Sequence, residues 1–363
     1  MIHAQQLCTS WPTHQLSEVV EFLDHLRVPV KNSERTPGPY PYYGANGQQG
    51  TIDGYIFDEP LILLAEDGGH FGMPGRKIAY TVHGKCWVNN HAHVLRVRSG
   101  VDISFLCRQL EEYDVTTFIS GTTRKKLTKA AASRILVVVP PLLEQRRIAA
   151  ILDKADAVCR KRQNALDLAD QFLRSAFLDL FGDPVTNPKR WPVKKLGDVL
   201  VDIEGGWSPK CESRPAQGDE WGVLKLGAVT WGIYDPQENK AMSTGTEPRV
   251  ELEVRNGDLL FARKNTYDLV GASAYVFETP PRLTLPDLIF RLVTDVSVDS
   301  VYLWMVLSHP GTRESLRRIA SGSAGSMPNI SKGRLKERAI PVPPLELQKP
   351  LTQLAEHHCN ALV

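Results

Sequence analysis

The chain has 363 residues, of which 42% are hydrophobic and 23% are charged, as is ordinary for a folded protein with two or three domains. Its net charge of +2 does not by itself indicate a nucleic-acid-binding protein. Residues 1–11 lack a basic segment followed by an apolar run, and no apolar stretch reaches the roughly 18 residues of a membrane span, so we expect a cytoplasmic protein.

Residues 1–140 have the pattern of a mixed domain, in which short strands alternate with turns and peripheral helices. Short elements are expected at 15–21 (helix) and within 55–65, 86–97 and 134–139 (strands). Residues 39–47 combine aromatic side chains with proline and glycine. This combination predicts a turn-rich loop whose backbone can approach a partner.

Residues 142–181 are expected to form one long helix, because they follow Pro140-Pro141 and contain no proline or glycine before Gly182. At 1.5 Å per residue such a helix is about 60 Å long. An ordinary buried helix of a single domain is the alternative, but globular helices average only about 11 residues. The length therefore favours a coiled-coil-like spacer between two domains, at 141–182.

One face of this helix carries a heptad pattern of large and small apolar residues, which predicts a surface for partner helices. The partner-binding residues expected there are Ile148, Leu152, Ala155, Cys159, Leu166, Ala169, Leu173, Ala176 and Leu180. A second row (Ile148, Ile151, Val158, Ala165 and Phe172) widens the apolar stripe. More than one partner helix is therefore expected.

The second half repeats the first. Lys195-Leu196-Gly197-Asp198-Val199 matches Gln15-Leu16-Ser17-Glu18-Val19. Later, Ser321-Gly322 and Pro343-Pro344-Leu345 with Gln348 repeat Ser120-Gly121 and Pro140-Pro141-Leu142 with Gln145. Three matches in the same order indicate an internal duplication. We therefore expect a second mixed domain at 183–342 and a shortened second helix at 343–363.

These features together resemble the specificity subunit of a type I restriction-modification enzyme, over nearly the whole chain. The segments that carry the resemblance are Tyr42-Tyr43-Gly44-Ala45-Asn46-Gly47, residues 89–94, residues 144–153, Gly257-Asp258-Leu259-Leu260-Phe261-Ala262-Arg263 and Pro343-Pro344-Leu345-Glu346. The resemblance implies an α/β (α+β) fold with two β-rich target-recognition domains, at 1–140 and 183–342. Each domain would read half of a split site in double-stranded DNA.

The resemblance also implies partners. Modification (methyltransferase) subunits, two of them, and restriction or translocase subunits are expected. S-adenosylmethionine, ATP and Mg are expected in those subunits, and no cofactor is expected in this chain. The short distal helix departs from the family pattern, and a second copy or a partner would complete it.

Catalytic motifs are missing from the sequence. GxGxxG and GxxxxGK[ST] do not occur between a strand and a helix, and no Asn-Pro-Pro-Phe or Asp-Pro-Pro-Tyr loop for adenine methylation is found. We therefore expect no catalytic residues and favour a binding protein over an enzyme. A fused methyltransferase or nuclease with an unrecognised active site remains the alternative.

No metal site is expected either. His91 and His93 form an HxH pair, but no third His, Cys or carboxylate lies close by in the sequence, which favours a structural or polar role. The six cysteines show no CxxC spacing and are expected to be reduced thiols.

Polar and basic side chains in turns and loops are the candidates for DNA contact. They are Tyr42, Tyr43, Asn46, Asn89, Asn90, His91, His93, Thr122, Arg124, Lys125, Lys126, Trp207, Lys210, Arg263, Lys264, Asn265, Ser323, Ser326, Asn329, Lys332 and Arg334. Arg263 directly follows an apolar strand, which favours contact with a base, whereas Lys125 and Lys126 lie in a flexible run suited to phosphates. The alternatives are solvent loops for the basic segments and packing roles for Tyr42 and Trp207.

Overall fold

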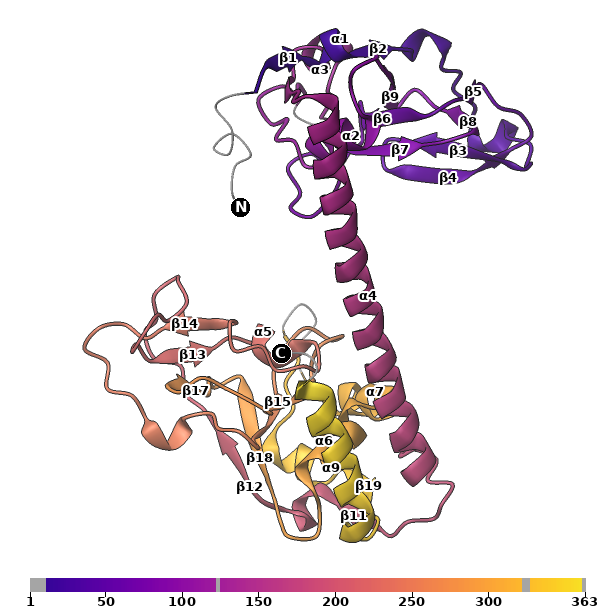
Figure 1. The fold of residues 1–363 in the computed structure, drawn as a ribbon. Helices are drawn as coiled ribbons and strands as arrows, with labels where there is room; N and C mark the ends of the chain where they lie inside the picture. The colour runs from indigo at the N-terminus through magenta and orange to yellow at the C-terminus, as the bar shows by residue number, and fades with distance from the viewer. Residues whose placement is uncertain (1–10, 122–124, 322–326, 361–363) are drawn as a thin grey trace. The chain divides into compact units, whose positions relative to one another are not determined.

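The computed structural model describes residues 11–121, 125–321 and 327–360 (Figure 1). The chain divides into two compact units, Met1–Lys161 and Arg162–Val363, here called the first and the second unit. Helix α4, Leu142–Phe181, crosses this boundary with the bounds expected from the sequence. Among the described residues, no helix combines the length and the apolarity that crossing a membrane requires.

The first unit contains two four-stranded sheets (Figure 1). One has the strand order β2 (Val20–Phe22), β9 (Ala92–Val97), β6 (Leu61–Ala65) and β7 (Ala79–Val82), and the other has the order β4 (Gly47–Ile52), β3 (Tyr40–Gly44), β8 (Lys85–Val88) and β5 (Phe57–Asp58). The remaining elements are β1 (Thr13–Gln15) paired with β10 (Leu136–Val138), α1 (Leu16–Val19), α2 (Ile103–Glu111), α3 (Lys129–Ala132), and the 3-10 helices at Asp24–Leu26 and Asn32–Glu34.

The second unit repeats this plan with longer connections. Its sheets are β12 (Leu200–Gly205), β18 (Ile289–Thr294), β15 (Leu259–Ala262) and β16 (Ser273–Tyr275), and β14 (Asn239–Ala241), β13 (Gly222–Leu224) and β17 (Leu283–Thr284). The remaining elements are β11 (Val193–Lys195) paired with β19 (Ala339–Pro341), α5 (Gly227–Thr230), α6 (Ser300–Ser308), α7 (Pro310–Ile319), α8 (Lys332–Lys336), α9 (Leu345–Asn360), and the 3-10 helices at Leu196–Asp198 and Val250–Leu252.

The sheet topology shows the duplication that the sequence indicated. In both units an antiparallel four-stranded sheet has its strands in the same order, and in both the other sheet contains one parallel pair, β3 with β8 and β13 with β17. The central strands β6 and β15 are buried at every position, as continuous apolar runs require. Their positions in the sheets determine where the polar residues that directly follow these two strands lie.

In each unit, a buried glutamine forms hydrogen bonds that hold the start of a helix in place. Gln145 accepts a hydrogen bond from the Asp102 N–H (2.8 Å) and donates to the carbonyls of Pro140 (2.7 Å) and Gly100 (3.1 Å). Gln348 accepts from the Asp299 N–H (2.8 Å) and donates to the carbonyls of Pro343 (2.7 Å) and Ser297 (3.4 Å). Asp102 and Asp299 cap α2 and α6. The repeated Pro-Pro-Leu-x-x-Gln segment therefore joins α4 and α9 to a capped helix.

Two local predictions were wrong. Residues 39–47 belong largely to the hairpin of β3 and β4, in which Gly47 adopts a positive φ of 111°, because the alternating aromatic residues pack as a strand. The helix expected at 15–21 is only α1, Leu16–Val19, and the chain continues into β2. Residues 20–22 pair with β9, which overrides their local preference.

Candidate nucleic-acid interface

The basic loops of the two units return to equivalent strand ends. In the first unit the Leu127 N–H donates to the Glu66 carbonyl just after β6 (2.7 Å). In the second unit the Ile330 N–H donates in the same way to the Arg263 carbonyl just after β15 (2.8 Å). The two loops that correspond in the sequence duplication therefore share the same backbone arrangement. Thr122, Arg124, Ser323 and Ser326 lie outside the described residues.

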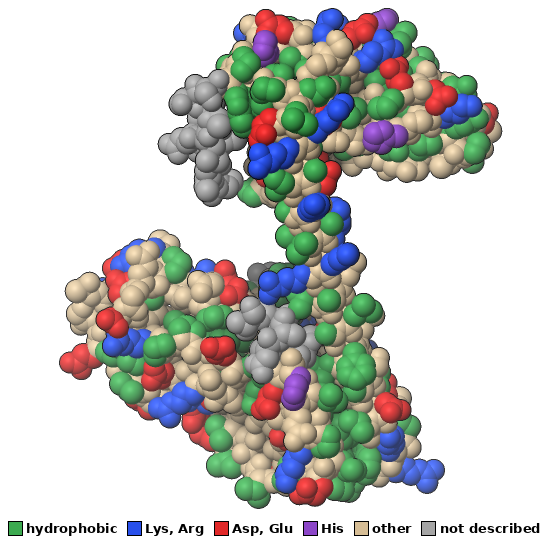
Figure 2. All heavy atoms as spheres, in the orientation of Figure 1, with side chains coloured by type: hydrophobic (Ala, Val, Ile, Leu, Met, Phe, Trp, Pro, Cys, Tyr) green, Lys and Arg blue, Asp and Glu red, His purple; other side chains and the backbone are tan. Residues whose placement is uncertain are grey.

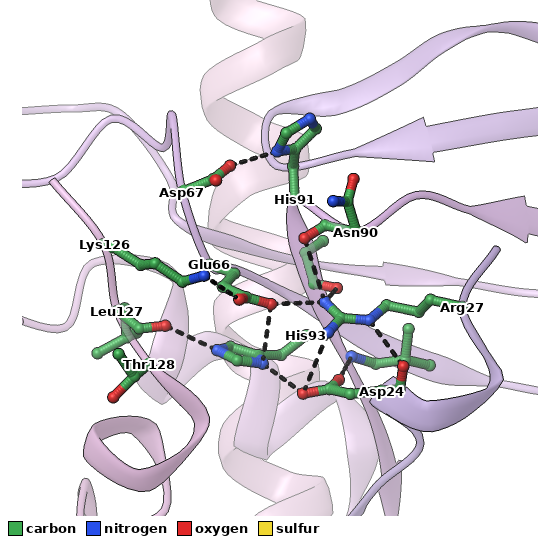
Figure 3. Close-up of polar contacts among 12 residues, drawn as sticks. Asp24, Arg27, Glu66, Asp67, Asn90, His91, His93, Lys126, Leu127 and Thr128 are labelled. Carbon is green, nitrogen blue, oxygen red and sulfur yellow. Dashed lines mark hydrogen bonds and ion pairs between the residues drawn. The ribbon is translucent and has the colours of Figure 1, made fainter. Parts of the chain in front are cut away.

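An ion-pair network lies at this strand end in the first unit (Figure 3). Arg27 contacts the Glu66 carboxylate at 2.6 Å and the Asp24 carboxylate at 3.6 Å. Lys126 contacts the other Glu66 oxygen at 2.9 Å. His93, only 1% exposed, places Nδ1 at 2.6 Å from Asp24 and Nε2 at 2.8 Å from the Leu127 carbonyl. Carboxylates and cations therefore balance one another around a buried histidine.

The carboxylates beside His93 correct one sequence expectation. His93, Asp24 and Glu66 offer ligand atoms within 4.8 Å of one another, so an HxH histidine does have carboxylates close by in space. His91 does not join them, because its Nδ1 contacts Asp67. Arg27 and Lys126 already supply the positive charge that these carboxylates require. The arrangement is that of a structural ion-pair network.

This network makes the first unit sensitive to acid. Burial raises the pKa of Asp24, but the hydrogen bond and the charge of His93 lower this pKa, and the net shift is downward. Burial likewise raises the pKa of Glu66, but the bonds from Arg27 and Lys126 outweigh it. A carboxylate whose pKa is lowered on folding stabilises the folded state at pH values above its unfolded-state pKa of about 4. This stabilisation is lost as the pH falls through the folded-state pKa and the group becomes protonated.

We therefore expect the thermal stability of the first unit to fall steeply as pH is lowered below about 4, and Asp24→Asn to flatten that dependence. The matched control is Asp53→Asn, which removes an exposed carboxylate. Thermal unfolding recorded from neutral pH into this acid range compares the two variants. An unchanged pH dependence in Asp24→Asn would show that the network does not stabilise the folded state.

The remaining candidates of the first unit differ in exposure. Tyr42 is buried, bonds to Val30 through its hydroxyl and carries the Arg35 guanidinium 3.7 Å above its ring, so it packs within the unit. Tyr43 is half-buried against Tyr80. Asn89 is buried and bonds to Gln49. The candidates that are exposed or partly exposed are Asn46, Asn90, His91, Lys125 and Lys126.

In the second unit, the strand end holds cations in place of the ion pairs. Arg263 donates from Nε to the Asn329 side chain (3.1 Å) and lies 5.0 Å from the centre of the Phe290 ring. The Lys332 ammonium lies 5.8 Å from the centre of the same ring. Within the described part of the chain, no carboxylate forms an ion pair with Arg263, Lys264 or Lys332. This strand end therefore presents positive charge.

The other candidates of the second unit are placed around this strand end or farther away. Asn265 is buried and donates to Thr230, so it supports the loop after β15. Trp207 lies under the Arg249 guanidinium at 4.5 Å. Lys210 is exposed, and so is Arg334, which donates to the Ile319 carbonyl at 2.9 Å. Lys210 and Arg334 are therefore accessible candidates outside the cluster around Phe290.

Helix α4 uses its two apolar rows differently. Leu173, at 2% exposure, packs with Phe177 and Phe181 in the core of the second unit, so it is not available to a partner. The second row, by contrast, is exposed at Ile151, Val158 and Phe172. Of the expected partner-binding residues, Leu152, Ala155 and Cys159 are exposed, and Ile148, Leu166, Ala169, Ala176 and Leu180 are partly exposed. Figure 2 shows hydrophobic and basic side chains interspersed along this helix.

A groove of about 1210 Å³ lies beside the end of α4 in the second unit. Phe177 and Leu178 of α4, the exposed Trp231 and Ile233, and Trp304 of α6 give it an apolar lining. Its other lining residues include Arg313 and Arg317, whose Nε atoms are buried without a partner among the described residues. Within the second unit, the groove is thus an apolar surface bordered by basic side chains.

Sequence reasoning missed Asp24, Arg27, Glu66, Gly205 and Phe290 as parts of the two strand-end sites. None of these residues belongs to a motif. They come together because strands that are distant in the sequence pair with one another. The duplication was the one signal that could have found them, by aligning Glu66 with Arg263.

Comparison with known proteins agrees with the resemblance. Residues 9–167 match the family described as the type I restriction modification DNA specificity domain. The type I restriction enzyme EcoEI specificity subunit of Escherichia coli is 34% identical over 168 residues, which cover 46% of this chain and 28% of that protein. The putative specificity subunit S.HindORF215P of Haemophilus influenzae is 36% identical over 143 residues, 39% of this chain and 37% of that protein. The chain therefore aligns with about a third of these relatives' lengths.

The fold also has a solved counterpart. The S subunit of a type I restriction-modification system from M. genitalium superimposes with a TM-score of 0.62 at 14% identity, covering 98% of this chain and 95% of that one. The expected mixed α/β fold with a long helix is confirmed.

Proposed function

We propose that this chain is the DNA-reading component of a type I restriction-modification complex, because residues 9–167 match the DNA specificity domain of that family and specificity subunits are among its relatives. The observation that carries the proposal is the repeated unit: residues 9–167 match a DNA specificity domain, and the second unit has the same sheet order. Each unit would read one half of a bipartite site in duplex DNA. The two halves would differ, because the two units differ at the strand ends where their loops meet.

The chain would act by positioning its partners. Modification subunits, two per complex, would carry S-adenosylmethionine and transfer the methyl group, and restriction subunits would carry ATP and Mg. The exposed row of α4 would contact a modification subunit, and the groove beside Phe177 and Trp231 in the second unit would offer a further apolar surface. The chain itself would be non-catalytic and cytoplasmic.

Sequence selection by the assembled complex tests this proposal. The chain is co-expressed with its modification subunit, and the complex selects from a pool of random duplexes; we expect two short conserved segments separated by a fixed gap. Recovery of unrelated sequences would contradict the proposal. Binding of S-adenosylmethionine by the isolated chain would favour the rival assignment, a fused methyltransferase.

A further inference from the structure

The two units place different side chains at equivalent positions of the same strand-end site. Strand register defines the equivalence, because Leu64 pairs with His93 as Phe261 pairs with Phe290, and Phe22 pairs with Leu95 as Ile203 pairs with Leu292. The equivalent pairs are Asp24 and Gly205, Glu66 and Arg263, Asp67 and Lys264, His93 and Phe290, Lys126 and Asn329, and Lys129 and Lys332.

These six positions differ strongly in charge. The first unit has three carboxylates and two lysines there, which gives a formal charge of −1 with His93 neutral. The second unit has three cations and no carboxylate, which gives +3. The six positions therefore differ by four formal charges between the units. In the first unit Arg27, which lies outside these six positions, pairs with Glu66 and Asp24 and brings the site to neutrality, so an anion is attracted to the second site more strongly than to the first.

The second unit also lacks a side chain at the position that Asp24 occupies in the first unit. Asp24 fills the first site by bonding to His93 and to the Val94 N–H (2.9 Å). At the equivalent Gly205 there is no side chain, and a Cβ placed there would lie 3.9 Å from the Phe290 ring and 4.0 Å from Lys332. Arg263 is held by Asn329 and Phe290 but meets no carboxylate among the described residues. Gly205 therefore supplies none of the negative charge that Asp24 brings to the first site.

We infer that Arg263 and Lys332, supported by Lys264, bind the phosphate backbone of DNA, and that the equivalent site of the first unit does not. This inference rests on the proposed DNA-reading function. Phosphates are the group that uncompensated Arg and Lys side chains attract most generally in duplex DNA. In the first unit, Glu66 and Asp24 already occupy Arg27 and Lys126, so a phosphate would have to displace existing ion pairs.

The geometry favours a phosphate over a base for Arg263. Reading a base edge requires a side chain to project into a major groove about 8.5 Å deep. Arg263 is instead folded back over Phe290, with its Nε engaged by Asn329. A side chain held in this way is better placed to meet a phosphate on the outside of the duplex than a base edge inside the groove.

The test measures how salt weakens DNA binding by the co-expressed complex. Arg263→Gln with Lys332→Gln is compared with wild type on the selected duplex and on a scrambled duplex. Each lost phosphate contact flattens the slope of log K against log salt by about 0.9, so the double variant should flatten it by about 1.8 on both duplexes. The glutamine at 263 keeps an amide donor for Asn329. Lys332→Gln alone changes an exposed side chain and should flatten the slope by about 0.9 without any effect on folding.

The matched control is Lys129→Gln, the equivalent of Lys332 in the first unit, which should leave the slope unchanged. An unchanged slope in Lys332→Gln and in the double variant, or an equal change in Lys129→Gln, would overturn the inference. A loss confined to the selected duplex would overturn it too, since it would assign base reading to Arg263. Wild-type complex that binds both duplexes equally would instead contradict the proposed function, so the two failures are distinguishable.

Discussion

The substitutions Phe172→Asp and Leu173→Asp, at adjacent positions of α4, are expected to have opposite results. Leu173 is buried in the core of the second unit, and an unpaired carboxylate there costs several kcal/mol, so Leu173→Asp should unfold that unit. Phe172 is 62% exposed, so Phe172→Asp should leave the fold intact and abolish association with the modification subunit.

Co-purification and circular dichroism of the two variants check this prediction. Leu168→Asp, at another exposed position of the same helix, should behave like Phe172→Asp. The matched control is Gln171→Glu, at an exposed position that is already polar, which should change neither the fold nor the association. Full co-purification of both Phe172→Asp and Leu168→Asp would mean that this part of α4 faces solvent in the complex.

The second large effect is expected at the two buried glutamines. Gln145→Ala leaves the Asp102 N–H and the carbonyls of Pro140 and Gly100 without their partner, and Gln348→Ala does the same in the second unit. Unsatisfied buried groups cost about 1–3 kcal/mol each, so each variant should lose about 3 kcal/mol or more. For units of this size that lowers Tm by roughly 6–12 °C.

Thermal unfolding followed by limited proteolysis locates the damage. Gln145→Ala should expose cleavage sites in the first unit, and Gln348→Ala in the second. The exposed Gln163, on the same α4 helix, provides a control whose alanine variant should unfold like wild type. A Tm within 2 °C of wild type for either buried variant would contradict the structural role of that glutamine.

Much of the fold followed from the sequence because its signals are local. The long helix has clear boundaries, Pro140-Pro141 and Gly182, and the structure gives it the bounds Leu142–Phe181. The duplication was visible because Gln145 and Gln348 perform the same task in the same short motif. Local motifs carry such information whenever the structural reason for a residue lies within a few positions of it.

The strand-end sites did not follow, because their partners meet through long-range pairing. Arg27 and Glu66 are 39 residues apart in the sequence, and Asp24 and His93 are 69 apart. The heptad pattern likewise predicted an apolar face on α4 without showing which row its own unit covers. Leu173 and Phe172 are both apolar, and only the packing of Phe177 and Tyr302 decides which of them is buried.

The central claim is that one chain reads two dissimilar half-sites. Long-read methylation mapping of a host that expresses this chain with its modification subunit tests it most directly. The account predicts a modified motif with two different short segments separated by a fixed unspecified gap. A continuous motif, or a strictly palindromic one in a complex with a single copy of this chain, would contradict it.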